Sequence, residues 1–254
     1  MLGAITGDIV GSIYEGRDIK TKDFPFFGQG CTFTDDTVCT VAVADCLMND
    51  GDFADYLRRY VRNHPNRGYG GMFLEWAGSN MGPYNSWGNG SAMRVSPVAH
   101  VARNEQELLD LAEQTSVVTH NHPDAVAGAQ ATALTMWLAK SGMDVAAIRE
   151  EIANRFDYDL SSSVDDIRPS YRFDISCAGT VPQAITCALE GTDYEDAIRN
   201  AISIGGDADT IACITGGIAE VMFGLPDEIV EASRAYLTDD LVEVVDRFAI
   251  TCKV

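Results

Sequence analysis

The sequence predicts an all-α fold, a single compact orthogonal bundle of more than ten helices. Apolar residues recur with a helical period along most of the chain, and capping residues precede many of these segments. No segment alternates apolar and polar residues as a half-buried strand does, and no hairpin turn is evident. Residues 1–254 are expected to form one domain, because no linker or repeat divides them.

The first predicted helix covers residues 2–15. Its apolar stripe is accompanied by a second stripe of glycines at four-residue spacing: Gly3, Gly7 and Gly11. Each glycine costs about 1 kcal/mol inside a helix, so this stripe predicts close packing of the backbone against a neighbour or a ligand. Asp8 and Glu15 are two turns apart and fall on a similar face.

The later helices are predicted from apolar periodicity together with their end signals. Asn104 with Glu107, and Thr192 with Glu195, have the spacing of a capping box. Pro123 suits the first turn of its helix. The predicted ranges are about 35–48, 53–63, 69–77, 104–118, 122–141, 143–156, 180–190, 193–204, 209–223, 226–236 and 239–249.

Composition and charge exclude several classes of function. A formal net charge of −20 argues against non-specific nucleic-acid binding through a basic surface. No apolar run reaches the roughly 18 residues of a membrane span, and the N-terminus lacks the basic start of a signal peptide. Seven scattered cysteines without a CxxC pair favour reduced, mostly buried thiols. We therefore expect a cytoplasmic protein that is a monomer and binds no membrane.

Two acidic signatures are the strongest functional signal: Thr34-Asp35-Asp36-Thr37 and Gly205-Gly206-Asp207-Ala208-Asp209-Thr210. Each opens an apolar helix. One aspartate would suffice to cap a helix, but each signature has two. If the fold brings the signatures together, the four carboxylates raise each other's pKa, and a divalent cation relieves the repulsion. Oxygen ligands without His or Cys point to Mg²⁺, Mn²⁺ or Ca²⁺.

Weaker features accompany these signatures. The Gly/Asn/Ser-rich loop 85–90 leads into a helix start and offers backbone N–H groups to a phosphate, although most such loops are plain turns. The loop 68–71 is similar. His120 and His122 would suit a transition metal, but a third soft ligand is missing nearby, so a histidine bonded to backbone or ligand at a helix start is favoured. The polar stretch 158–179 is expected to be a loop over a site.

Taken together and in order, segments of this chain resemble the ADP-ribosylglycohydrolase family. The resemblance covers residues 3 to about 224 and implies an all-α fold around a binuclear Mg²⁺ or Mn²⁺ centre. The chain is shorter than many members, and it reads Asn-Gly-Ser where members often have a second glycine or Asp-Gly. These departures concern acceptor specificity more than the reaction. The matching segments are 7–15, 33–37, 68–70, 88–94, 119–120, 179–184 and 205–212.

The resemblance also implies roles for single residues. Glu15 corresponds to a flexible glutamate that approaches a metal and the scissile ribose, and His120 to a histidine that contacts substrate. The stretch 173–177 corresponds to the region near the adenosine. The implied metal ligands are Thr34, Asp35, Asp36, Asp207, Asp209 and Thr210. The implied cradle for the diphosphate and ribose consists of Gly70, Ser86, Trp87, Gly88, Asn89 and Gly90.

The implied reaction is hydrolysis of the bond between C1″ of ADP-ribose and an acceptor, such as a modified arginine or serine on a protein. Its transition state would resemble an oxocarbenium ion, with Glu15, Asp35 or Asp36 as the catalytic general base. Sequence alone does not rank these three. Other classes stay open: a non-catalytic ADP-ribose-binding protein, a metal-stabilised structural protein, or the same hydrolase acting on O-acetyl-ADP-ribose or nucleobase-linked ADP-ribose.

Overall fold

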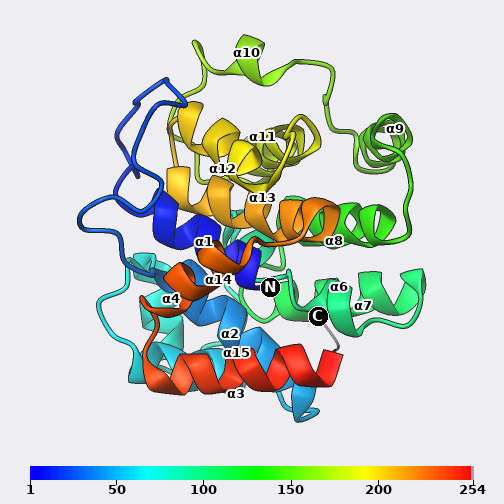
Figure 1. Ribbon diagram of the computed structural model, residues 1–254. Helices are drawn as coiled ribbons and strands as arrows, with labels where there is room; N and C mark the ends of the chain where they lie inside the picture. The colour runs from blue at the N-terminus through cyan, green and yellow to red at the C-terminus, as the bar shows by residue number, and fades with distance from the viewer. Residues whose placement is uncertain (253–254) are drawn as a thin grey trace.

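The computed structural model describes residues 1–252, which form fifteen α-helices and no β-sheet (Figure 1). The predicted all-α class is confirmed. An isolated bridge between Gly88 and Ser176 is the sole strand-like pairing within this range. The helices are α1 (Leu2–Gly11), α2 (Asp35–Met48), α3 (Phe53–Asn63), α4 (Gly71–Ala77), α5 (Gly90–Met93), α6 (Val98–Val101), α7 (Glu105–Val117), α8 (Pro123–Lys140), α9 (Val145–Phe156), α10 (Val164–Ile167), α11 (Cys177–Leu189), α12 (Tyr194–Ser203), α13 (Ala208–Phe223), α14 (Asp227–Arg234) and α15 (Asp239–Cys252).

The central pair of helices is α1 and α13, which lie side by side in the middle of the bundle (Figure 1). The glycine stripe of α1 forms this contact, as the close-packing prediction requires. A Cβ atom added to Gly7 would lie 1.9 Å from the carbonyl oxygen of Ala212, and one added to Gly11 would lie 2.5 Å from Cα of Asp209. The glycines therefore let α1 approach the start of α13, where the second acidic signature lies.

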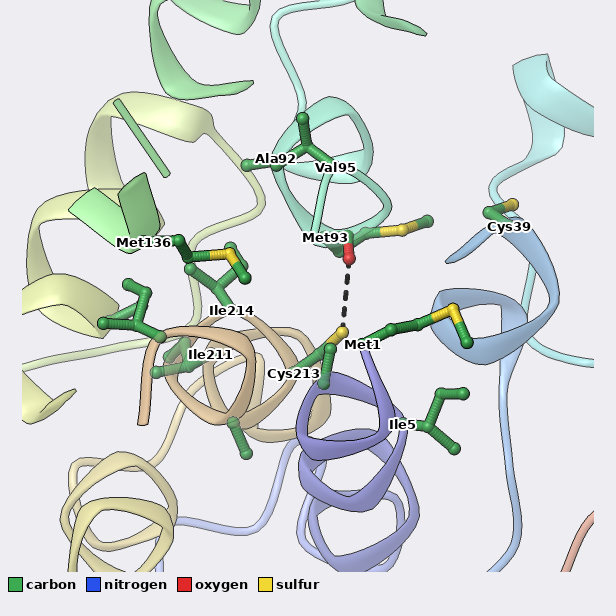
Figure 2. Close-up of a cluster of buried hydrophobic side chains, with 14 of the residues drawn as sticks. Met1, Ile5, Cys39, Ala92, Met93, Val95, Met136, Ile211, Cys213 and Ile214 are labelled. Atoms are coloured by element: carbon green, nitrogen blue, oxygen red, sulfur yellow. Dashed lines mark hydrogen bonds between the residues drawn. The ribbon is translucent and has the colours of Figure 1, made fainter. Parts of the chain in front are cut away.

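The core around α13 is formed by apolar side chains from many parts of the chain (Figure 2). Ile211 and Ile214 of α13 are buried, as is Ile5 of α1. Cys213 donates a hydrogen bond from Sγ to the carbonyl oxygen of Met93, at 3.3 Å, and so ties α13 to the end of α5. This contact holds the segment after the loop 85–90 beside the start of α13.

A second group of helices, α2, α3 and α15, packs beside this pair (Figure 1). The buried carboxylate of Asp45 on α2 links all three. It accepts hydrogen bonds from Arg59 and Tyr60 of α3, at 2.7 and 2.9 Å, and from Arg247 of α15. A buried acid is stable when it is paired in this way, so the network fixes the orientation of α2.

Several predicted boundaries need correction. The helix expected over 2–15 ends at Gly11, and a tight turn follows, in which Gly16 has φ +65°. The helix expected over 180–190 begins earlier, at Cys177, because the Ser176 hydroxyl accepts from the Gly179 N–H at 2.9 Å. The helix start expected after the loop 85–90 is that of α5, whereas the short helices α6 and α10 were not predicted, since four residues are too few to show a period.

The capping predictions have mixed outcomes. Asn104 caps α7 by accepting from the Glu107 N–H at 2.9 Å, but the Glu107 carboxylate turns to Arg103 instead of completing the box. The box predicted at Thr192 is wrong, because the neighbouring Asp193 side chain caps α12. The prediction that proline occupies the first turn of α8 is confirmed.

The cysteines and the polarity of the helices complete the description of the fold. All seven cysteines are free thiols, and only Cys252 is partly exposed. Between residues 1 and 252, each helix is either too short or too polar to cross a lipid bilayer.

Candidate metal and ligand site

The start of α2 is capped without help from its own aspartates. Thr34 is the capping residue, and its Oγ1 accepts from the Asp36 N–H at 3.3 Å. Asp8 of α1 accepts from the Thr34 N–H at 2.9 Å, the Thr34 hydroxyl at 2.6 Å and the Thr37 N–H at 3.1 Å. Neither Asp35 nor Asp36 caps α2, so both carboxylates are free for another role.

The aspartate at the start of α13 likewise makes no capping hydrogen bond. Gly205 and Gly206 have φ angles of +74° and +77°, a conformation that favours glycine, and they turn the chain sharply into the helix. Asp207 occupies the capping position but makes no capping hydrogen bond. Its Oδ2 instead accepts from Nδ2 of Asn89 at 2.7 Å, which joins the loop 85–90 to the second signature.

The two signatures meet, as the sequence predicts. The Thr210 hydroxyl donates to Oδ1 of Asp36 at 3.4 Å. Carboxylate oxygens of Asp8, Asp36 and Asp209 lie within 4.8 Å of one another, and so do those of Glu15, Asp207 and Asp209. Throughout residues 1–252, these are the two acid clusters tight enough to hold an ion, and neither includes a histidine or cysteine.

The electrostatics of the clusters are unfavourable without a cation. Asp36 and Asp209 are 3% and 5% exposed. Burial raises the pKa of both far above the usual range, and charge on Asp8 adds to this for Asp36, as charge on Asp207 does for Asp209. Burial and then the Asp8 charge raise the pKa of Asp35 to about 7. No lysine or arginine of the described chain pairs with these three acids.

Every residue that the sequence assigned to the site lines one cavity of about 520 Å³. Acids, threonines, loop residues and the histidine all line it, although they come from distant parts of the chain. Met72, Tyr84, Arg94, Phe173 and Ile175 line it as well. The assigned residues in its wall are Glu15, Thr34, Asp35, Asp36, Gly70, Ser86, Trp87, Gly88, Asn89, Gly90, His120, Asp207, Asp209 and Thr210.

The loop 86–90 is held by two neighbours. The Asn89 N–H donates to the carbonyl oxygen of Ile175 at 2.8 Å, and the Cys177 N–H donates to that of Trp87 at 3.1 Å. The His120 ring packs on the other side, because a Cβ atom added to Gly90 would lie 2.9 Å from His120 Nε2. Glycine at this position lets the ring touch the loop backbone.

The stretch 158–179 contributes to the mouth of the cavity. It contains the short helix α10 and the first turn of α11, so it is not wholly a loop. Phe173 lines the cavity with 53% of its surface exposed, and Trp87 of the facing loop is 49% exposed. Large exposed aromatic rings at a cavity mouth are suited to stacking on a planar group.

The two histidines, His120 and His122, have different contacts. His122 caps α8, with Nδ1 accepting from the Asp124 N–H at 3.2 Å, which confirms the helix-start interpretation for that residue. His120 is buried and contacts Thr119, with 2.7 Å between Nδ1 and the threonine Oγ1. Neither belongs to an acid cluster, so the structure offers no support for a transition-metal pair.

Three residues that shape the site, Asp8, Arg94 and Thr119, are not among the predicted site residues, although each lies in a segment that resembles the family. The sequence places Asp8 on the same helix face as Glu15 but gives it no role. Arg94 could have been found as a lone cation after a small-residue helix start. The role of Thr119 depends on contacts that only the folded chain makes.

Comparison with known proteins gives the family. The family model described as ADP-ribosylglycohydrolase matches residues 1–254. ADP-ribosylarginine hydrolase Tri1 of Pseudomonas putida is 29% identical in an alignment of 273 positions that covers 91% of this chain and 72% of that protein. ADP-ribosylhydrolase ARH3 of Homo sapiens is 25% identical in an alignment of 328 positions that covers 95% of this chain and 90% of that protein.

A solved structure has the same fold. It is titled ADP-ribosylglycohydrolase-related protein complex, and it superposes with a TM-score of 0.72 at 23% identity, covering 98% of this chain and 97% of the other. The whole-length family match, together with a cavity that gathers the family's motif residues, leads to one conclusion. The chain is a hydrolase that belongs to the ADP-ribosylglycohydrolase family.

Proposed function

We propose that this protein uses two divalent cations, Mg²⁺ or Mn²⁺, to release ADP-ribose from a modified side chain, with arginine and serine linkages as the leading substrates. One observation carries the proposal: buried acids line the same cavity as an amide-rich loop and exposed aromatic rings. The similarity to proteins named as hydrolases of ADP-ribosylated targets supports the substrate class. The family match over the full length supports a single working domain.

The donor set supports the cations. Oδ2 of Asp36 is buried and bonds to no other group among residues 1–252, as expected of an oxygen that ligates an ion. All the candidate donors are hard oxygens, which suit Mg²⁺ and Mn²⁺. When bound, the ions would fix the ribose hydroxyls and make a nearby water more acidic. The residues that would hold them are Thr34, Asp35, Asp36, Asp207, Asp209 and Thr210.

The rest of the cavity suits the remainder of ADP-ribose. Backbone N–H groups of the loop 86–90 would bind the diphosphate. Arg94 is a buried cation without a carboxylate partner in residues 1–252, so its charge offsets that of the diphosphate in a chain of net charge −20. Trp87 and Phe173 would stack on the adenine at the mouth. Each portion of the ligand thus has a matching surface.

Glu15 is the general base that the geometry favours. Among the three acids considered for this role, Glu15 is the most exposed to solvent, whereas Asp35 is half-buried and Asp36 is buried. Its carboxylate also reaches within 4.8 Å of those of Asp207 and Asp209. A proton-transfer group must reach both the substrate and solvent, whereas Asp36 is buried within its cluster. Glu15 would therefore accept a proton from the attacking water.

The test is release of ADP-ribose from separate arginine-linked and serine-linked proteins, with acetyl- and nucleobase-linked ADP-ribose in the same panel. We expect release from at least one linkage, loss of release in EDTA, and recovery on adding Mg²⁺ or Mn²⁺. Calorimetry with free ADP-ribose runs alongside. Binding of ADP-ribose without release from any linkage would favour a non-catalytic binding protein instead.

A further inference from the structure

Three buried side chains form a hydrogen-bonded chain that ends in the cavity. Arg94 follows α5, while Thr119 and His120 lie between α7 and α8. Nη2 of Arg94 lies 2.8 Å from Oγ1 of Thr119, and that oxygen lies 2.7 Å from Nδ1 of His120. Arg94 is further held by the carbonyl oxygen of Thr115. This series of hydrogen bonds is thus held in place at Arg94, and it ends at the His120 ring, which lines the cavity.

The direction of the chain follows from what each group can do. A guanidinium can only donate, so Oγ1 of Thr119 accepts from Arg94. The threonine has one hydroxyl proton, and within residues 1–252 its single remaining contact is Nδ1 of His120. If Nδ1 were protonated, that hydroxyl proton would be buried without an acceptor, an arrangement that folded proteins rarely contain. Nδ1 is therefore the acceptor, and the neutral ring carries its proton on Nε2.

The surroundings keep the ring neutral and its Nε2 free. Burial and then the charge of Arg94 hold the pKa of His120 well below its usual range. Nε2 faces the loop, 2.9 Å from the position of a Cβ atom on Gly90 and 3.6 Å from one on Gly88. Nothing in the described part of the chain hydrogen-bonds to Nε2. A single oriented N–H group therefore points to the place where a ligand would meet the loop.

We propose that Arg94 and Thr119 are positioning residues that fix His120 as an Nε2–H donor to an oxygen of the ADP-ribose held at Gly88 and Gly90. The identity of the ligand rests on the proposed function, whereas the tautomer does not. The cationic donor strengthens the chain, because a hydroxyl that accepts from a guanidinium becomes a better donor itself. Thr119 also places the loop, since its carbonyl oxygen accepts from the N–H groups of Tyr84 and Ser86 at 3.4 Å.

The test reads the tautomer directly. Protein labelled with ¹⁵N in its four histidines gives separate long-range ¹H–¹⁵N patterns for Nδ1–H and Nε2–H rings, and the His120 signals are assigned by their loss in His120→Gln. We expect Nε2–H in the wild type and in Thr119→Ser, which keeps the hydroxyl. Thr119→Val has nearly the same shape without the donor, so it should lose the tautomer preference and bind ADP-ribose about 5- to 10-fold more weakly by calorimetry.

Thr132→Val is the matched control. Thr132 is a buried threonine of α8 whose hydroxyl has no partner among the described residues, so its removal should change neither the spectrum nor the affinity. An Nδ1–H ring in the wild type, or an unchanged Nε2–H ring and affinity in Thr119→Val, would overturn the proposal. The wild-type spectrum decides the tautomer even if Thr119→Val does not fold. An Nε2–H ring in a protein without affinity for ADP-ribose would contradict the proposed function while upholding the assigned tautomer.

Discussion

The hydroxyl of Thr210 lies 3.4 Å from Oδ1 of Asp36, and this contact joins two helix starts that are 174 residues apart in sequence. Around it, acids from α1, α2 and α13 share one buried volume. Burial and then the neighbouring charges raise the pKa of Asp36 and Asp209, so their ionised forms are unfavourable in the folded chain without a cation. A divalent ion would stabilise these ionised forms and would stabilise the fold at the same place where it binds the ligand.

Replacing a clustered acid should remove the response to metal. Asp36→Asn and Asp209→Asn are each expected to lose the Mg²⁺- or Mn²⁺-dependent rise in Tm and to lower ADP-ribose release by at least about 100-fold, since even outer-shell changes cost 10- to 100-fold at metal sites. Thermal unfolding with and without the ions measures the first effect. Asp23→Asn, on an exposed loop, is the control and should respond as the wild type does. A full metal-dependent shift in Asp209→Asn would contradict the site.

Glu15→Gln should separate binding from turnover. The amide keeps the size of the side chain but cannot accept the proton, so turnover should fall by about 100-fold or more while the Kd for ADP-ribose changes less than about threefold. Single-turnover release and calorimetry measure the two quantities. Exposed Glu113→Gln serves as the control. Turnover close to that of the wild type would remove Glu15 from the mechanism.

Without metal, Asp35 should make the protein less stable as pH rises from 5 to 7.5. Its pKa is about 7 in the folded chain against an ordinary value of 3.8, so the stability that it contributes at low pH is lost as pH rises through 7. Burial lowers the pKa of His100 to about 2 and holds that of His120 well below its usual range, so these two residues have the opposite effect between pH 5 and 6.5. The contribution of Asp35 is therefore read as the difference in Tm between the wild type and Asp35→Asn in EDTA. This difference should fall by several degrees across the window, given about 2–4 °C per kcal/mol for a chain of this size.

Added Mg²⁺ should remove this fall, because a bound cation stabilises the ionised acids. Asp23→Asn should keep the pH dependence that the wild type shows in EDTA. A difference in Tm between the wild type and Asp35→Asn that stays constant from pH 5 to 7.5 in EDTA would show that the charge of the cluster does not strain Asp35.

Gly7→Ala should destabilise the fold strongly. Its new Cβ atom would lie 1.9 Å from the carbonyl oxygen of Ala212, a backbone atom that cannot move alone, so α1 and α13 must separate. We expect a loss of about 1–3 kcal/mol or more in the free energy of unfolding, measured by urea titration. In Gly82→Ala the added atom meets nothing within 4 Å, so this control should be near neutral. Equal stability of the two variants would refute close packing as the purpose of the stripe.

Trp87→Ala should weaken ADP-ribose binding by about 5- to 150-fold, because stacking of a base on an aromatic ring contributes about 1–3 kcal/mol. Free ribose 5-phosphate lacks the base, so its weaker binding should change little. Phe223→Ala removes an exposed aromatic ring far from the cavity wall and is the control. Equal losses for both ligands would place Trp87 at the sugar or phosphate instead of the adenine.

Much of the fold is predictable because its signals are local. The bounds of α2 and α3 match the predicted ranges, since a capping residue and a terminating residue flank each apolar period. The single-turn helices α6 and α10 escape prediction because one turn has no period, and α5 is predicted only as a helix start after the loop 85–90. The cap of α12 was misplaced by one residue because Thr192 and Asp193 both suit the position, and only the backbone path selects Asp193.

The sequence by itself predicted the acids, glycines and loop residues that line the cavity, because their chemistry is visible in short motifs. Tertiary structure alone decided that Asp8 of α1 accepts hydrogen bonds from the start of α2 and so leaves Asp35 and Asp36 free. It also decided the order Arg94, Thr119, His120, which sets the proton on Nε2. The physical reason is range: periodicity and capping act over a few residues, whereas a hydrogen bond between distant elements depends on how every helix packs.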